Sequence, residues 1–262
     1  MTKDPTGVST AQKKDGTVYY RASLTRGRKH ISLGSYDDPV KAHQAYEEAV
    51  RLLADPEIRI IDYSEECSLS FEKWVCLINF RDNRIYIANP IYILRKMFYY
   101  YLSPSEILKF DADDLFYYSS HKIMKRGGHL FAADYGSQVN ILNRHGIKSY
   151  AVEGRDYFFI NGDILDFRSS NLDIVNHYAG VTKEVHRGKT VYRVRIHING
   201  NYIVGDYPDE ITAAIAYNKA ADTLAAKGFE KSFVRNDIAD ISEEEIRRIY
   251  SEIKISSKII RY

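Results

Sequence analysis

Residues 191–220 read VYRVRIHINGNYIVGDYPDEITAAIAYNKA, and this stretch contains the clearest structural pattern in the chain. Apolar and polar residues alternate in its first part, which predicts a strand with one buried face and one polar face. Asn199-Gly200 is typical of a hairpin turn into a second strand. Asp209 then precedes alanines at helical spacing, so we expect a capped helix that lies close to the apolar face of a small sheet.

A second copy of this pattern lies near the N-terminus. Its strand, turn and second strand end at Asp38-Pro39, a helix cap followed by proline at the first helical position. Seven identical residues keep one constant offset between the copies, which chance rarely produces. The pairs are Gly34/Gly205, Tyr36/Tyr207, Asp38/Asp209, Ala42/Ala213, Ala45/Ala216, Tyr46/Tyr217 and Ala49/Ala220. The sequence therefore contains an internal repeat.

The net charge of +2 conceals an uneven distribution. Residues 1–36 carry seven basic and two acidic side chains, a net charge of +5, and residues 180–205 carry five basic and one acidic, a net charge of +4. The rest of the chain is therefore at −7. Positive charge concentrated in the two repeats indicates an anionic partner such as nucleic acid.

A helix that covers one face of each sheet leaves the other face to solvent. Such a face can enter the major groove, where arginine reads guanine and asparagine reads adenine. The expected DNA-contacting residues of the first copy are Arg21, Ser23, Thr25, Arg26, Arg28, Lys29, His30 and Ser32. Those of the second copy are Lys183, Arg187, Arg193, Arg195, His197, Asn199, Asn201 and Ile203. The alternative is a merely solvated face on a protein-interaction module.

Both copies resemble the APETALA2/ethylene-response-factor type of DNA-binding domain, over roughly residues 7–55 and 180–235. The segments Gly34-Ser35-Tyr36 and Gly205-Asp206-Tyr207 match the family's G-x-F/Y turn, and the alanine-rich helix matches its A-x-x-A-Y pattern. The plant family's tryptophan signature is missing, since the sole tryptophan, Trp74, lies outside both copies. The chain is more similar to the version found in bacterial and phage HNH homing endonucleases.

The middle of the chain is rich in tyrosine, phenylalanine and isoleucine. We expect helices starting near Ser103 and over 135–144, then a strand over 155–160, a turn at 161–163 and a helix from Asn171. This final order of elements is similar to the strand, turn, strand and helix of an HNH (ββα-metal) nuclease. The basic residues Lys122, Lys125 and Arg126 beside a glycine pair are candidates for phosphate contact.

The resemblance implies a nuclease site without its chemistry. Aligned on Asn161-Gly162-Asp163, Phe158 stands at the family's metal-binding aspartate and Phe159 at its catalytic histidine, while Phe167 replaces an asparagine and Asn171 is retained. Phenylalanine neither accepts a proton nor binds a metal. We therefore expect no catalytic residue, no metal and no cofactor; Cys67 and Cys76 are not at zinc-ligand spacing. The alternative is an active nuclease with a rearranged metal site.

These observations predict an α+β protein with two small three-stranded sheet-plus-helix modules flanking a mixed α/β HNH-like centre. The expected domains are 1–65, 66–178, 179–240 and a C-terminal helix over 241–262, which packs on the second repeat or dimerises. The predicted function is sequence-specific binding of double-stranded DNA, as a transcriptional repressor of phage or mobile-element origin that has lost cleavage. No membrane segment or secretory signal is expected, so the predicted location is cytoplasmic, at the nucleoid when bound to DNA. The protein is expected to be a monomer or homodimer, and any regulatory peptide, protein or small molecule is unknown.

Overall fold

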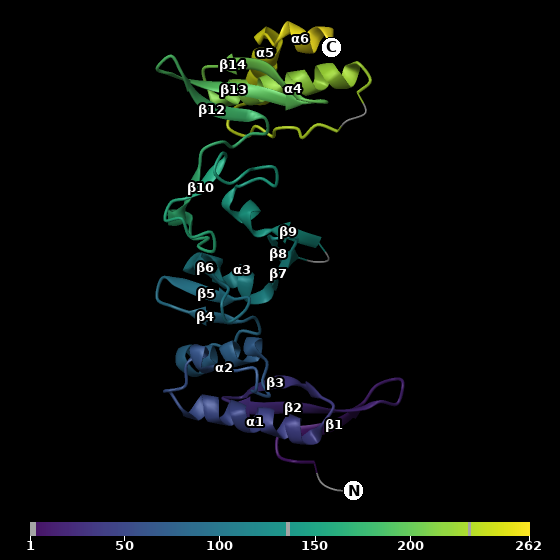
Figure 1. The fold of residues 1–262 in the computed structure, drawn as a ribbon, viewed down its shortest axis with the longest axis vertical. Helices are drawn as coiled ribbons and strands as arrows, with labels where there is room; N and C mark the ends of the chain where they lie inside the picture. The colour runs from purple at the N-terminus through teal and green to yellow at the C-terminus, as the bar shows by residue number, and fades with distance from the viewer. Residues whose placement is uncertain (1–3, 135–136, 230–231) are drawn as a thin grey trace. The chain divides into compact units, whose positions relative to one another are not determined.

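The computed structural model describes residues 4–134, 137–229 and 232–262. These form a mixed α+β architecture of helices and small antiparallel sheets, as predicted (Figure 1). The chain divides into two compact units, Met1–Ile141 with Asp163–Ser169, and Leu142–Gly162 with Ser170–Tyr262. Within the described ranges, no helix has both the length and the apolar character needed to cross a membrane.

The N-terminal copy of the repeat forms the predicted module in the first unit. Strands β1 (Val8–Gln12), β2 (Val18–Arg26) and β3 (Lys29–Tyr36) make one antiparallel sheet, and α1 (Pro39–Ala54) covers one of its faces (Figure 1). Asp38 caps α1 by accepting the Val40 N–H at 2.8 Å. The alanines of the stripe are fully buried, so the helix backbone lies close to the sheet.

The C-terminal copy repeats this arrangement in the second unit. Strands β12 (Val181–His186), β13 (Lys189–His197) and β14 (Asn201–Tyr207) form a sheet covered by α4 (Glu210–Ala226). Asp209 caps α4 by accepting the Thr212 N–H at 2.7 Å. The offset found in the sequence therefore corresponds to a repeated fold.

The two copies share a bulge that the sequence comparison did not reveal. The strand register shifts between Ala22 and Ser23 in β2, and at the matching place between Val194 and Arg195 in β13. The N–H group at each bulge is satisfied by a glycine carbonyl, Gly7 for Ser23 at 2.9 Å and Gly180 for Arg195 at 2.8 Å. The bulge therefore sets the position of the backbone from which the predicted base-reading arginine Arg195 projects.

Different elements cover the two repeat helices. In the first unit, α2 (Phe71–Asn83) packs on α1, and η1 (Ile60–Asp62) precedes it. In the second unit, α5 (Glu243–Glu252) and α6 (Ser257–Arg261) pack on α4. The apolar residues Ile246, Ile249 and Tyr250 join the core of the C-terminal module. The tail helix thus packs on the second repeat, the first of its two expected roles.

The rest of the first unit contains two further sheets. One comprises β4 (Ile91–Ile93), β5 (Met97–Tyr101) and β6 (Ile107–Asp111); the other comprises β7 (Ile123–Arg126), β8 (His129–Asp134) and β9 (Ser137–Asn140). The short helices η2 (Ala112–Asp114) and α3 (Leu115–Ser120) lie between them in sequence.

Two predicted helices in this region are wrong. Ser103 instead forms a turn between β5 and β6, because its hydroxyl and carbonyl both accept the Glu106 N–H. Residues 137–140 form β9 by pairing with β8, and only η3 (Ile141–His145) after it is helical. Residues 135 and 136 of the expected 135–144 helix lie outside the described residues.

The nuclease-like segment forms a hairpin without the predicted helix. Strand β10 (Tyr157–Phe159) pairs antiparallel with β11 (Leu172–Ile174), which η4 (Ser169–Asn171) precedes. The helix expected from Asn171 is wrong, because the Asn171 carbonyl and side chain accept the N–H groups of Ile160 and Asn161, each at 2.8 Å. These bonds join Asn171 to the preceding strand, and the chain continues as β11.

Candidate nucleic-acid interface

The face of the N-terminal sheet that points away from α1 is polar and free of acidic residues. Its polar row includes the exposed Arg21, Thr25, His30 and Ser32, together with Ser23, which is half-buried. The three strands contain no aspartate or glutamate. This face therefore offers one guanidinium group surrounded by hydroxyl and imidazole groups, which can bond to phosphates or to base edges.

Arg21 is held at this face by its neighbour Tyr19. The guanidinium lies 5.3 Å from the centre of the Tyr19 ring, and its Nη2 donates to the Tyr19 hydroxyl at 2.5 Å. A cation stacked on an aromatic ring keeps its outer N–H groups free for an additional acceptor.

Three other predicted residues of this copy do not share the face. Arg26 and Lys29 oppose each other at the hairpin end, in the row that points toward the helix side. The Lys29 ammonium accordingly lies 5.5 Å from the Tyr86 ring centre. Arg28 occupies the turn itself, with a φ of 64°. The structure therefore separates these cations from Arg21.

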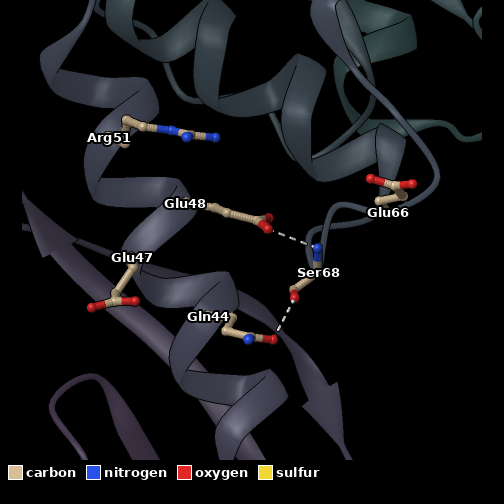
Figure 2. Close-up of a pocket in the computed structure, with 6 residues that line it drawn as sticks. All are labelled: Gln44, Glu47, Glu48, Arg51, Glu66 and Ser68. Carbon is tan, nitrogen blue, oxygen red and sulfur yellow. Dashed lines mark hydrogen bonds between the residues drawn. The ribbon is translucent and has the colours of Figure 1, made fainter.

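The helix side of the N-terminal module carries negative charge beside α1. A hollow of about 350 Å³ is lined by Glu47, Glu48 and Glu66, together with Gln44, Arg51 and Ser68 (Figure 2). Three carboxylates against one arginine repel a polyanion. Of these two surfaces, the uncovered sheet face is the one suited to nucleic acid.

The uncovered face of the C-terminal sheet carries two arginines that are paired with carboxylates. Arg193 donates from Nε and Nη2 to Asp206 at 2.7 and 2.8 Å, and its Nη1 lies 2.9 Å from Glu184. Arg195 donates from Nη2 to the other Glu184 oxygen at 2.9 Å. The hydrogen bond from Arg193 holds the pKa of Asp206 below its usual range. Glu184 thus holds both arginines from one side.

This network leaves the two arginines with different capacities to donate further hydrogen bonds. Arg193 uses all three of its nitrogens on carboxylates. Arg195 uses Nη2, while its Nε and Nη1 have no acceptor among the residues that the structure describes. Arg195 can therefore still present donors to a guanine edge, and the Glu184 bond restricts the rotation of its side chain.

Glu184 and Asp206 are site residues that the sequence did not predict. From the sequence, Glu184 entered only the net charge, and the basic face was expected to be uncompensated. Strand alternation on β12 contained a usable signal for Glu184, which shares a face with Thr182, the residue opposite Arg193. On β14 the bulge breaks the alternation, so Asp206 shares a face with Asn201 and Ile203 despite its different parity. Only the register across three strands brings the four side chains together.

The remaining predicted residues of this copy lie at different places. His197 and Asn201 are bonded to each other at 3.0 Å on the arginine face, where Ile203 is 51% exposed. Lys183 opposes Tyr192 and therefore belongs to the helix-side row. Two residues lie in turns: Arg187, with a φ of 50°, and Asn199, which accepts a bond from the Tyr202 hydroxyl.

The basic residues of the central region are largely neutralised within the first unit. Lys122 contacts both carboxylate oxygens of Glu72 at 2.7 and 3.0 Å, and Lys125 contacts Glu106 at 2.5 Å. Arg126 lies at the exposed end of the β7–β8 hairpin. Of the three, Arg126 is best placed to meet phosphate.

The nuclease-motif positions differ in burial and in contacts. Phe158 is 42% exposed on β10, and Asn171 is buried beneath the turn that it closes. Phe167 is buried and stacks on Phe110, with ring centres 5.6 Å apart. Within the described ranges, no group of three histidine, cysteine or acidic side chains is arranged to hold a metal ion.

Asp163 and Asp166 of this segment are also engaged. Asp163 is bound by the Lys109 ammonium at 2.6 Å, and this hydrogen bond lowers its pKa. Asp166 is fully buried and accepts two bonds from Arg168, at 2.8 and 2.5 Å. Both carboxylates therefore serve as partners for cations of the same unit.

Comparison with known proteins yields no relative. Neither a protein-family description, nor a curated protein, nor a solved structure matches the chain.

Proposed function

We propose that the protein binds double-stranded DNA at specific sequences through the uncovered faces of its two repeated sheets. The observation that carries the proposal is the repeated module: each copy covers one sheet face with a helix and leaves arginine, Arg21 or Arg195, on the other. A narrow antiparallel sheet fits the major groove, where arginine donors meet guanine acceptors.

The two faces contribute differently to DNA binding. The N-terminal face contributes mainly to affinity, and the C-terminal face mainly to specificity. The N-terminal face has no acidic residue in its strands, so it favours phosphate contact as well as base contact. The C-terminal face has Glu184 and Asp206 beside its arginines, which weakens attraction to phosphate. On this face, the largest gain in binding free energy comes from a base edge that supplies matched acceptors to Arg195.

The nuclease-like segment supports a protein that binds DNA without cleaving it. Phe158 and Phe159 stand where the similar nucleases have a metal ligand and a base, and the segment lacks the following helix. A site-specific binder of this kind acts by excluding other proteins, so we assign it the role of a transcriptional repressor, encoded by a phage or mobile element.

The decisive experiment is selection of bound fragments from random duplex DNA by the full chain. We expect an enriched site whose two halves depend on Arg21 and on Arg195 separately. Affinity for that site should fall steeply with salt, because phosphate contacts release counterions. Absence of enrichment together with salt-independent binding would refute the proposal. Cleavage of the selected site in Mg²⁺ or Mn²⁺, abolished by chelation, would replace the repressor with a nuclease.

A further inference from the structure

A small hollow lies on the helix side of the N-terminal module, at the end of the β2–β3 hairpin. It has a volume of about 270 Å³. Its lining consists of Arg26, Gly27, Leu53, Phe80, Arg81 and Arg84. All of these residues belong to the first unit.

The walls of the hollow are held in place by backbone capping. Arg81 donates from Nη1 to the carbonyls of Asp55 at 2.6 Å and Ile58 at 2.8 Å, which ties the end of α1 to α2. Arg84 ends α2 in the left-handed conformation, with its N–H bonded to the Phe80 carbonyl at 3.1 Å. These bonds fix the backbone at Phe80 and Arg84, and both residues line the hollow.

The residues in and around the hollow carry mostly positive charge. Arg81 is paired with Asp82 at 2.6 Å, so its charge is compensated. Arg26 and Arg84 are exposed and have no acidic partner in the part of the chain that the structure describes. Lys29 and Lys73 add further cations, each 5.5 Å from the centre of the Tyr86 ring, which packs edge-on against Phe80.

We propose that this hollow binds a small phosphate monoester with a compact apolar body. The exposed Arg26 and Arg84, which both line the hollow, suit a phosphate, whose charge of about −1.5 to −2 exceeds that of a carboxylate. Leu53 and Phe80 supply an apolar floor for the esterified group. The volume lies just below the common range of ligand pockets, about 300–1,000 Å³, and therefore limits the ligand to few heavy atoms.

The hollow is distinct from the proposed DNA-contacting face. Arg26 and Lys29 belong to the helix-side row of the hairpin, whereas Thr25 and His30 belong to the opposite row. Binding in the hollow can therefore be measured without DNA, and its result is independent of whether the sheet faces bind a duplex. A DNA phosphate is the other source of the same chemical group, so the test must separate the two.

The test is calorimetric titration of the full chain with phenyl phosphate, inorganic phosphate and phenol. We expect saturable binding of phenyl phosphate, about tenfold weaker binding of inorganic phosphate, and none of phenol. Arg26→Gln and Arg84→Gln should each weaken phenyl phosphate binding about tenfold or more, since hydrogen bonds to charged groups are strong. Arg95→Gln, which replaces an exposed arginine in another turn of the same unit, is the matched control and should bind as the wild type does.

Three outcomes would overturn the proposal. They are absence of saturable binding, equal binding by Arg84→Gln and Arg95→Gln, and equal affinity for phenyl phosphate and inorganic phosphate. Displacement of phenyl phosphate by a duplex of unrelated sequence would assign the hollow to the DNA backbone instead. Circular dichroism of the variants checks folding, and we expect no change because Arg26 and Arg84 are exposed.

Discussion

Glu48 and Lys219 occupy the same position in the two repeats and carry opposite charges. Glu48 holds the start of one helix, and Lys219 holds the end of another. Glu48 accepts the N–H groups of Ser68 and Leu69, each at 2.9 Å, immediately before α2 begins (Figure 2). Lys219 donates to the carbonyls of Tyr250 at 2.6 Å and of Ile253 at 2.9 Å, where α5 ends. Each charge opposes the partial charge of the helix end that it meets.

In both copies a tyrosine bonds to the same segment that Glu48 or Lys219 holds. The Tyr36 hydroxyl donates to the Ser68 carbonyl at 3.0 Å, and the Tyr207 hydroxyl donates to the Lys254 carbonyl at 2.9 Å. Burial raises the pKa of each hydroxyl to about 12, with the charges of Glu48 and Asp206 adding to the effect. Both hydroxyls therefore remain donors at neutral pH.

Replacing Lys219 should destabilise the C-terminal module. Lys219→Met removes the donor and leaves the carbonyls at the end of α5 without their partner, so we expect a loss of about 1.5–3 kcal/mol in the free energy of unfolding. Urea unfolding measures this loss. Lys258→Met, at an exposed site on α6, is the control and should change stability little. Equal stability of the two variants would show that Lys219 does not hold α5.

Gly180→Ala should destabilise the protein more than Gly188→Ala. The φ angles of these glycines are 70° and 75°, so the backbone strain of an added Cβ is similar. At Gly180 the Cβ would lie 2.4 Å from the Arg195 carbonyl oxygen and from the Tyr217 ring, whereas at Gly188 it would meet nothing within 4 Å. The difference between the two unfolding free energies isolates the close approach of α4 to the sheet. No difference would contradict this packing.

The buried Asp156 should make the second unit acid-sensitive. Burial raises the pKa of this carboxyl, but bonds from Arg155, Val152 and Asn176 outweigh burial and lower the pKa below its ordinary value. The stabilisation is therefore complete above the unfolded-state pKa of about 3.9 and is lost as pH falls through the folded-state pKa.

Asp156→Asn tests this linkage. At pH 7 we expect the variant to lose about 1.5–3 kcal/mol of unfolding free energy. The gap to wild type should narrow progressively below about pH 4, because this carboxyl is protonated first in the unfolded chain and only at lower pH in the folded protein. Asp173→Asn replaces an exposed aspartate on β11 and should change stability by less than about 0.5 kcal/mol. A gap that stays constant down to pH 2 would contradict the assigned pKa direction.

Arg195→Ala should reduce affinity for the selected DNA site by about 1–3 kcal/mol and relax the preference at one base pair. The reason is the pair of donors, Nε and Nη1, that remains after the Glu184 bond. Competition binding against the selected site and its single-base variants measures both effects. If all sequences weaken equally, Arg195 contacts phosphate rather than a base.

Glu184→Gln should have the opposite effect on unselected DNA. Loss of its negative charge leaves Arg193 and Arg195 less compensated, so non-specific binding should tighten and the slope of log K against log salt should become steeper by about one. The ratio of specific to non-specific affinity should fall. Glu243→Gln, at an exposed position on α5, serves as the control with the same change of charge. Unchanged specificity would show that Glu184 does not position the arginines.

Much of the modular fold was predictable because it depends on local patterns. The alternation around Arg193, the cap at Asp209 and the alanine stripe are all read within a few residues, and both modules formed as expected. The helix expected from Asn171 failed for a non-local reason. Its carbonyl and side chain bond to residues 160 and 161 across the loop, which no local propensity reveals.

Sequence alone therefore established the repeat, the two sheet-plus-helix modules and the polar parity of their exposed strands, because chain periodicity dictates which side chains share a face. Tertiary structure alone decided which cations are available. The register of three strands brings Glu184 and Asp206 into contact with the arginines. The energy of a charge depends on neighbours distant in sequence, so charge counting along the chain could not find this difference.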